Sequence, residues 1–219
     1  MNNYLNKFYL LLFVAVLLAG ATFAWQFYQT KNITVKPNTT PLISTGYYEI
    51  PTNDDAVLGN PGAPLTVVMF SDFVCSDCQK QYLTITNFVR QNPQSVRMFL
   101  KYSPSVNLFL KPNDLPVRAA LCADKQSQFW PYLDALHSAS SQSNEKTLNQ
   151  IAADLKLNKI AWQNCLTSND IQQKVAAESA LSRTLNINTL PTFFINNKKL
   201  NLDKNLNIID LLSKLISKP

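Results

Sequence analysis

Residues 65–78 read Leu65-Thr66-Val67-Val68-Met69-Phe70-Ser71-Asp72-Phe73-Val74-Cys75-Ser76-Asp77-Cys78, an apolar run that leads into two cysteines separated by two residues. The run over residues 65–70 is short and rich in β-branched side chains, which predicts a buried strand. Beyond it the apolar positions recur at helical spacing, at Cys78, Tyr82, Ile85 and Val89. We therefore expect a helix that starts near Cys75 and carries Cys78 on its buried face.

A second apolar run at residues 96–102 predicts another strand, so this part of the chain has the order strand, helix, strand. Such a unit implies a parallel strand pair joined by a right-handed crossover. From Leu115 to Leu185 the pattern is helical throughout, which is too much for a connecting loop. We expect a helical insertion over about residues 112–185.

The C-terminal part returns to a strand pattern at residues 192–195, followed by the Asn196-Asn197 pair and a short run at 198–200. Asparagine tolerates positive φ, so this pattern predicts a hairpin. A last amphipathic helix is expected over about residues 207–217.

The Cys75-Ser76-Asp77-Cys78 motif suits thiol–disulfide exchange. A cysteine at a helix N-terminus has a lowered pKa because unpaired backbone N–H groups and the helix dipole stabilise its thiolate. Cys75 has that position, which makes it the expected nucleophile. Cys78, one turn later and facing inward, is the expected resolving thiol that attacks a mixed disulfide on Cys75.

Two other roles for the same spacing fit less well. A zinc site would need two further ligands, and with His137 the only histidine these would have to be Cys122 and Cys165, far along the helical insertion. A purely structural CxxC disulfide closes too small a loop to stabilise the fold much. We therefore expect no metal at this centre.

Cys122 and Cys165 both fall in expected helices of the insertion. A structural disulfide between them is the favoured interpretation, and it would be worth roughly 4 kcal/mol in the chain-entropy model. Two free buried thiols, or a second redox pair that relays electrons to the CxxC, remain alternatives.

Three motifs together resemble the DsbA-like branch of the thioredoxin superfamily over about residues 56–219. They are Phe73-Val74-Cys75-Ser76-Asp77-Cys78 after an apolar strand, Phe129-Trp130 in the helical region, and Leu190-Pro191-Thr192-Phe193-Phe194-Ile195-Asn196. The resemblance implies an α/β, thioredoxin-like fold with an inserted helical subdomain. It also implies that Pro191 is the cis-proline beside the cysteines and that the backbone of Leu190 pairs with a bound substrate strand.

The sequence departs from the family at two places that affect redox poise. Strong oxidants of the family often carry Pro-His or Pro-Tyr between the cysteines, where this chain has Ser76 and Asp77. A carboxylate beside Cys75 should raise its pKa, which predicts a weaker oxidant. The buried acid that relatives often carry six residues before the first cysteine is replaced by Met69, and Asp72 or Asp77 is a possible substitute.

The N-terminus carries an unbroken uncharged stretch over residues 8–28, which as a helix would span roughly 30 Å, the thickness of a bilayer's hydrocarbon core. Residues 1–28 are therefore expected to be a transmembrane anchor, or alternatively a cleaved signal peptide, with an extended linker at 29–55 and the folded domain at 56–219. Either choice places the domain outside the cytoplasm, where disulfides persist.

We thus expect a protein thiol–disulfide oxidoreductase that introduces disulfides into exported proteins and needs no bound cofactor beyond the Cys75–Cys78 disulfide. The resemblance implies a membrane redox partner of the DsbB or vitamin K epoxide reductase type. A disulfide reductase or isomerase of the same fold and a redox-inert binding or chaperone module are the alternatives. The formal charge of +6 is scattered along the chain, which argues against nucleic acid as a partner.

Overall fold

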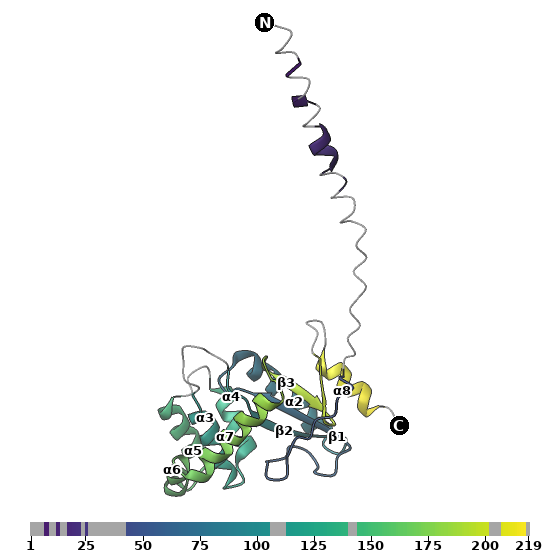
Figure 1. The fold of residues 1–219 in the computed structure, drawn as a ribbon. Coiled ribbons are helices and arrows are strands. Elements are labelled where there is room, and N and C mark those ends of the chain that lie inside the picture. The colour runs from purple at the N-terminus through teal and green to yellow at the C-terminus, as the bar shows by residue number, and fades with distance from the viewer. Residues whose placement is uncertain are drawn as a thin grey trace. The chain divides into compact units, whose positions relative to one another are not determined.

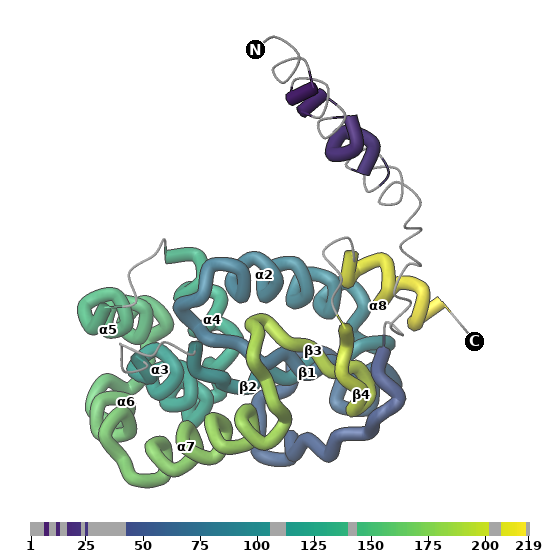
Figure 2. The backbone as a smooth tube through the Cα atoms, turned by 45° about the horizontal axis from the view of Figure 1, so that its top comes forward, coloured from purple at the N-terminus to yellow at the C-terminus, as the bar shows by residue number. Residues whose placement is uncertain are grey.

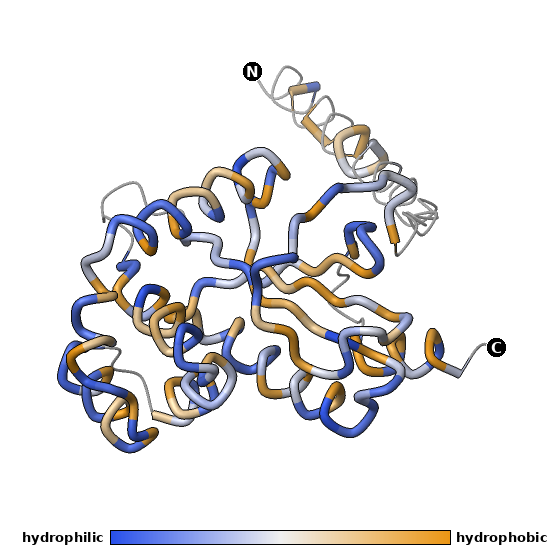
Figure 3. The backbone as a smooth tube through the Cα atoms, turned by 90° about the horizontal axis from the view of Figure 1, so that it is seen from below, coloured by the Kyte–Doolittle hydropathy of each residue, from blue (hydrophilic) through white to orange (hydrophobic). Residues whose placement is uncertain are grey.

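A four-stranded sheet with the order β2-β1-β3-β4 forms the centre of the fold. β1 (Leu65–Ser71) runs parallel to β2 (Val96–Tyr102) and antiparallel to β3 (Thr192–Ile195), which pairs in turn with β4 (Lys198–Lys199). The middle strands are covered on both faces, which is why they are almost uninterrupted apolar runs. Figure 3 shows these hydrophobic strands at the centre of the molecule.

Two layers of structure cover this sheet. α2 (Ser76–Gln91) connects β1 to β2, and it shares one apolar cluster with α8 (Ile208–Ile216) on one face. α7 (Asn169–Thr184) lies on the other side, where Ile187 and the N-terminal segment around Ile50 complete a smaller cluster. Figures 1 and 2 show α2 and α7 on opposite sides of the strands. The predicted strand–helix–strand unit is confirmed.

The helical insertion between β2 and β3 is also confirmed. Its helices within the described residues are α3 (Leu115–Asp124), α4 (Phe129–Ser138), α5 (Glu145–Asp154), α6 (Lys159–Leu166) and α7. The apolar faces of α3 and α4 carry buried residues throughout, and Trp162 of α6 donates from its indole Nε1 to the Ala119 carbonyl of α3 at 3.1 Å. The protein therefore has a thioredoxin-like α/β fold with an inserted helical subdomain.

The computed structural model describes residues 43–105, 113–139, 144–201 and 207–217, with a few isolated residues between Lys7 and Trp25. The chain divides into two units, Met1–Thr40 and Pro41–Pro219. Within the described residues no helix is both long enough and apolar enough to cross a membrane. Most of the anchor expected over residues 1–28, and residues 29–42 of the expected linker, lie outside the described part of the chain.

Residues 43–55, which their composition assigned to the linker, pack on the folded domain. Ile43 forms an antiparallel bridge with Leu200, and the Ser44 amide donates to the Lys199 carbonyl at 2.9 Å. Ile50 is buried against the sheet. The folded unit therefore begins before the expected boundary at residue 56, because this irregular segment supplies apolar cover to a sheet face that α7 covers only in part.

Candidate active site

Cys75 occupies the N-cap of α2, with extended backbone angles (φ −79°, ψ 124°). It is bonded to Cys78, and its Sγ accepts a hydrogen bond from the Cys78 amide at 3.1 Å. Cys75 is half-buried, whereas Cys78 is fully buried in the cluster beneath the sheet-facing side of α2. Cys75 is thus the more exposed residue of the pair, and Cys78 is the buried one.

The loop between β1 and Cys75 is a tight turn built on Asp72. The Asp72 carbonyl accepts from the Cys75 amide at 3.2 Å, and its Oδ1 accepts from the Val74 amide at 3.2 Å. Asp72 and Phe73 are buried, but the Val74 side chain is 50% exposed immediately before the nucleophile. The site therefore presents an apolar side chain to the surface next to its reactive sulfur.

The two residues between the cysteines both face solvent. Ser76 is exposed, and the Asp77 carboxylate lies 3.5 Å from the Lys80 ammonium with side-chain exposures of 75% and 78%. Exposed charges in such pairs act weakly because water screens them. The Asp77 carboxylate should therefore disfavour the Cys75 thiolate less than its position in the sequence suggested.

The Leu190–Pro191 peptide bond is cis, and β3 begins at the next residue. Thr192 pairs with Phe70 in the antiparallel register, so Pro191 comes beside the end of β1, where the loop to Cys75 begins. Leu190 is half-buried and packs against both apolar clusters. The structure thus brings the Leu190–Pro191 pair and the cysteine motif to one end of the sheet, although they are far apart in the sequence.

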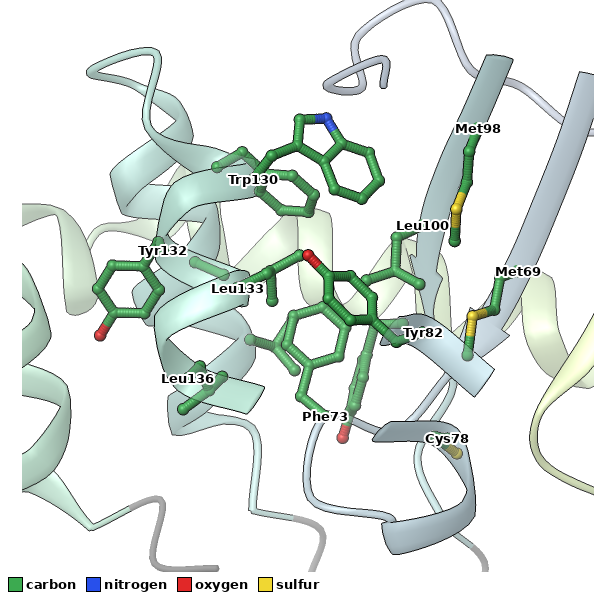
Figure 4. Close-up of a cluster of buried hydrophobic side chains, with 14 of the residues drawn as sticks. Met69, Phe73, Cys78, Tyr82, Met98, Leu100, Trp130, Tyr132, Leu133 and Leu136 are labelled. Carbon is green, nitrogen blue, oxygen red and sulfur yellow. The ribbon is translucent and has the colours of Figure 1, made fainter. Parts of the chain in front are cut away.

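α4 holds the insertion against the active-site helix. The Tyr82 hydroxyl donates to Asp134 Oδ1 at 2.8 Å, and Arg90 pairs with Asp134 Oδ2 at 2.6 Å. The Tyr82 ring also stacks on Trp130. Figure 4 shows Tyr82 pointing from α2 toward α4, with Cys78 at the start of its helix. Burial raises the Tyr82 pKa, and the neighbouring Asp134 charge adds to the effect.

From the sequence alone, His137 is most simply a residue of the surface or of a helix end. It does lie in the last turn of α4, but it is buried, with its ring 4.3 Å from that of Tyr82 and 6.4 Å from that of Phe73. Its carbonyl accepts from the Gln79 side chain, next to Cys78. Burial lowers the His137 pKa to about 4, so the ring is neutral at ordinary pH. Its spacing from Trp130 and Leu133 was the signal for a buried helix face.

The second disulfide joins Cys122 of α3 to Cys165 of α6, with their Cα atoms 5.7 Å apart. Cys122 is fully buried and Cys165 is half-buried. With the Cys75–Cys78 bond this accounts for all four cysteines of the chain. The pairing is the one that the sequence favoured, and it ties together two helices of the insertion.

A parallel strand–helix–strand unit, a bonded CxxC pair at the start of its helix and a cis-proline at the start of the adjoining antiparallel strand together define a thioredoxin-fold thiol–disulfide oxidoreductase. A family model described as thioredoxin matches residues 51–217, and the chain belongs to that family. The helical insertion makes it a DsbA-like member of the thioredoxin superfamily.

Relatives and solved structures agree with this assignment. The probable disulfide bond formation protein D of Bacillus anthracis is 26% identical over 173 residues, which cover 74% of this chain and 76% of the relative. The structure of oxidised BdbD from Bacillus subtilis superposes with a TM-score of 0.64 at 22% identity, covering 78% of this chain and 96% of that one. A thioredoxin-like oxidoreductase from Silicibacter pomeroyi gives a TM-score of 0.62 at 24% identity, covering 75% and 93%.

Proposed function

We propose that this protein is a thiol–disulfide oxidase that introduces disulfide bonds into exported proteins through Cys75 and Cys78. The observation that carries the proposal is the pairing of a half-buried Cys75 at the N-cap of α2 with a fully buried Cys78. When the disulfide is reduced, the Cys78 amide can still donate to Cys75 Sγ, so the helix start stabilises a Cys75 thiolate as the leaving and attacking group.

The reaction proceeds by two exchanges. A client thiolate attacks Cys75 Sγ, the Cys75–Cys78 bond breaks, and its electron pair leaves on Cys78 as a thiolate that takes up a proton. A second client thiolate then attacks the client sulfur of the mixed disulfide and releases Cys75 as a thiolate. The client loses two electrons and two protons, and the enzyme gains them as a dithiol.

The cycle needs an electron acceptor. The reduced Cys75 and Cys78 would pass two electrons and two protons to a membrane partner of the DsbB or vitamin K epoxide reductase type, linked to a quinone. The uncharged stretch at residues 8–28 supports a location outside the cytoplasm, with the domain anchored at the membrane or released after cleavage. The name of the Bacillus anthracis relative supports net disulfide formation rather than reduction.

The reduction potential of the Cys75–Cys78 pair, measured by equilibration with glutathione, decides the direction of electron flow. Known pairs span about −270 mV for thioredoxin to about −120 mV for the strong oxidant DsbA. We expect a reduction potential that is less negative than that of cytosolic glutathione, roughly −220 to −260 mV, but more negative than that of DsbA. A potential near that of thioredoxin would exclude the oxidase and leave a reductase or isomerase of the same fold.

Trapping identifies the clients. In Cys78→Ala the resolving thiol is missing, so mixed disulfides on Cys75 should accumulate and be visible on non-reducing gels. Cys75→Ala is the matched control, because it has the same change at the neighbouring cysteine and should trap nothing. If Cys75→Ala supported disulfide formation in a reduced client as well as the wild type, the protein would be a redox-inert binding module.

A further inference from the structure

The Asp72 carboxylate is a buried charge that the exchange reaction described above does not use. Asp72 is 5% exposed, and within the described residues no cation pairs with it. Its partners are two backbone amides: Val74 N donates to Oδ1 at 3.2 Å, and Ser105 N donates to Oδ2 at 2.9 Å. The side chain is thus satisfied by hydrogen bonds, but its charge is not neutralised by an ion.

The hydrogen bond from Val74 lies within the active-site turn, and the one from Ser105 connects this turn to the segment that follows β2. The Asp72 carbonyl receives the Cys75 amide, so residues 72–75 form a four-residue turn that the Oδ1 bond to Val74 reinforces from inside. Ser105 lies just beyond the end of β2, where the Ser103 amide also donates to the Ser71 carbonyl. One carboxylate therefore holds the turn that leads into Cys75 and fastens it to the exit of β2.

Burial makes this charge more effective than the one at Asp77. Asp77 is exposed and lies beside Lys80, so solvent and a counter-ion both screen it. Asp72 has neither form of screening within the described residues, and charge interactions are stronger in the less polar interior. A carboxylate near a thiol disfavours the thiolate. Relatives often carry an acid at the position of Met69, but in this chain that position holds a fully buried apolar side chain, so it supplies no charge.

We propose that Asp72 is a positioning residue for disulfide exchange: its carboxylate fixes the turn that presents Cys75, and its buried charge makes the Cys75–Cys78 disulfide a weaker oxidant. This inference rests on the proposed exchange function. According to this proposal, the carboxylate that disfavours the Cys75 thiolate is that of Asp72 rather than that of Asp77. The proposal also separates two effects, because geometry depends on the hydrogen bonds and redox poise depends on the charge.

The test compares Asp72→Asn, which removes the charge, with Asp72→Glu, which keeps it on a longer side chain. Asp210→Asn, the same change at an exposed site on α8, is the matched control. The pKa of Cys75 is measured from thiolate absorbance in the reduced protein, and the redox equilibrium is measured against glutathione. In Asp72→Asn the Cys75 pKa should fall by about one unit, and the equilibrium should shift about three- to tenfold toward the reduced enzyme.

Asp72→Glu should leave the pKa within a few tenths of a unit of the wild type while slowing exchange with a client dithiol, because only the geometry is disturbed. Asp210→Asn should change neither quantity. The proposal would be overturned if, in Asp72→Asn, the Cys75 pKa stayed within about 0.3 unit of the wild-type value and the redox equilibrium with glutathione stayed within about twofold.

Unfolding measurements separate this role from a merely structural one. If Asp72 only supported the fold, Asp72→Asn would destabilise the oxidised and reduced forms equally, and the redox equilibrium would not move. A wild-type protein that fails to exchange disulfides with glutathione would refute the proposed function itself. A wild-type protein that exchanges normally, beside an unaltered Asp72→Asn, refutes the role of Asp72 alone.

Discussion

Removal of the Cys122–Cys165 disulfide should destabilise the protein far more than removal of the active-site disulfide. The perturbation is the double variant Cys122→Ala/Cys165→Ala, which leaves no unpaired thiol in the insertion. The bond spans a sequence separation of 43 residues, whereas Cys75–Cys78 spans only 3. A crosslink acts mainly by restricting the unfolded chain, and the restriction grows with the length of the loop it closes.

The magnitude follows from these separations. The chain-entropy relation gives about 4 kcal/mol for the 43-residue separation and no more than about 2 kcal/mol for the CxxC pair. Alanine at the buried position of Cys122 adds up to about 1 kcal/mol of lost packing. The native insertion should survive, because Trp162 still donates to the Ala119 carbonyl and Arg118 still donates to the Leu166 carbonyl at 2.9 Å.

The assay is urea unfolding followed by circular dichroism, with Cys75→Ala/Cys78→Ala as the matched control. We expect the free energy of unfolding to fall by about 4 to 5 kcal/mol in the insertion variant and by much less in the control. A loss below about 1 kcal/mol in the insertion variant would refute the reasoning. In that case the alternative of a second redox pair should be tested by measuring its reduction potential separately from that of the CxxC.

Three further predictions concern buried polar groups. Burial lowers the His137 pKa from 6.5 to about 4, so the free energy of unfolding should decrease as pH falls through that interval. The wild type should lose about 3 kcal/mol more over this interval than His137→Gln. NMR of this sole histidine should measure its pKa directly. The pH dependence from Glu178 runs the other way, because burial raises its pKa from 4.5 to about 6 despite the nearby Lys101 ammonium. Its contribution to the free energy of unfolding, on the order of 2 kcal/mol, should be lost as pH rises from 4.5 to 6. This pH-dependent loss should be missing from the unfolding profile of Glu178→Gln. Asp134→Asn should lower the free energy of unfolding by about 1 kcal/mol and speed proteolysis of the insertion, because it weakens the contact with Tyr82 between α2 and α4.

Much of the fold was predictable because its signals are local. The apolar runs at residues 65–70 and 96–102 and the helical period after Cys75 each specify one element, and their order specifies the parallel unit. The end of the sheet that carries the active site follows from the same facts, because Cys75 comes directly after β1. The pairing of Cys122 with Cys165 was favoured by the cysteine count and the expected helices, although the sequence left other states open.

The rest depended on tertiary contacts that leave little trace in composition. Residues 29–55 contain three prolines and several asparagines and threonines and no sustained apolar period, so they resembled a tether. Within the described part of this stretch, however, Ile50 is buried and Ile43 pairs with Leu200. The helix-end position of His137 was predictable, but its burial was not. A lone histidine is amphipathic, and only the packing of α4 on α2 shows which side of the helix it faces. The position of Pro191 beside the end of β1 required the register between β1 and β3.

The acidic residues near the cysteines show why nearness in sequence is a poor guide to electrostatics. Asp77 lies between the two cysteines, but its carboxylate is solvated and paired with Lys80. Asp72 is three residues before Cys75, yet its carboxylate is buried, and the hydrogen bonds it accepts within the described residues come from the Val74 and Ser105 amides. The interaction of a charge with a thiolate depends on the polarity of the medium between them as much as on distance. The oxidising strength of Cys75–Cys78 should therefore depend more on the buried turn that precedes the motif than on the two residues inside it.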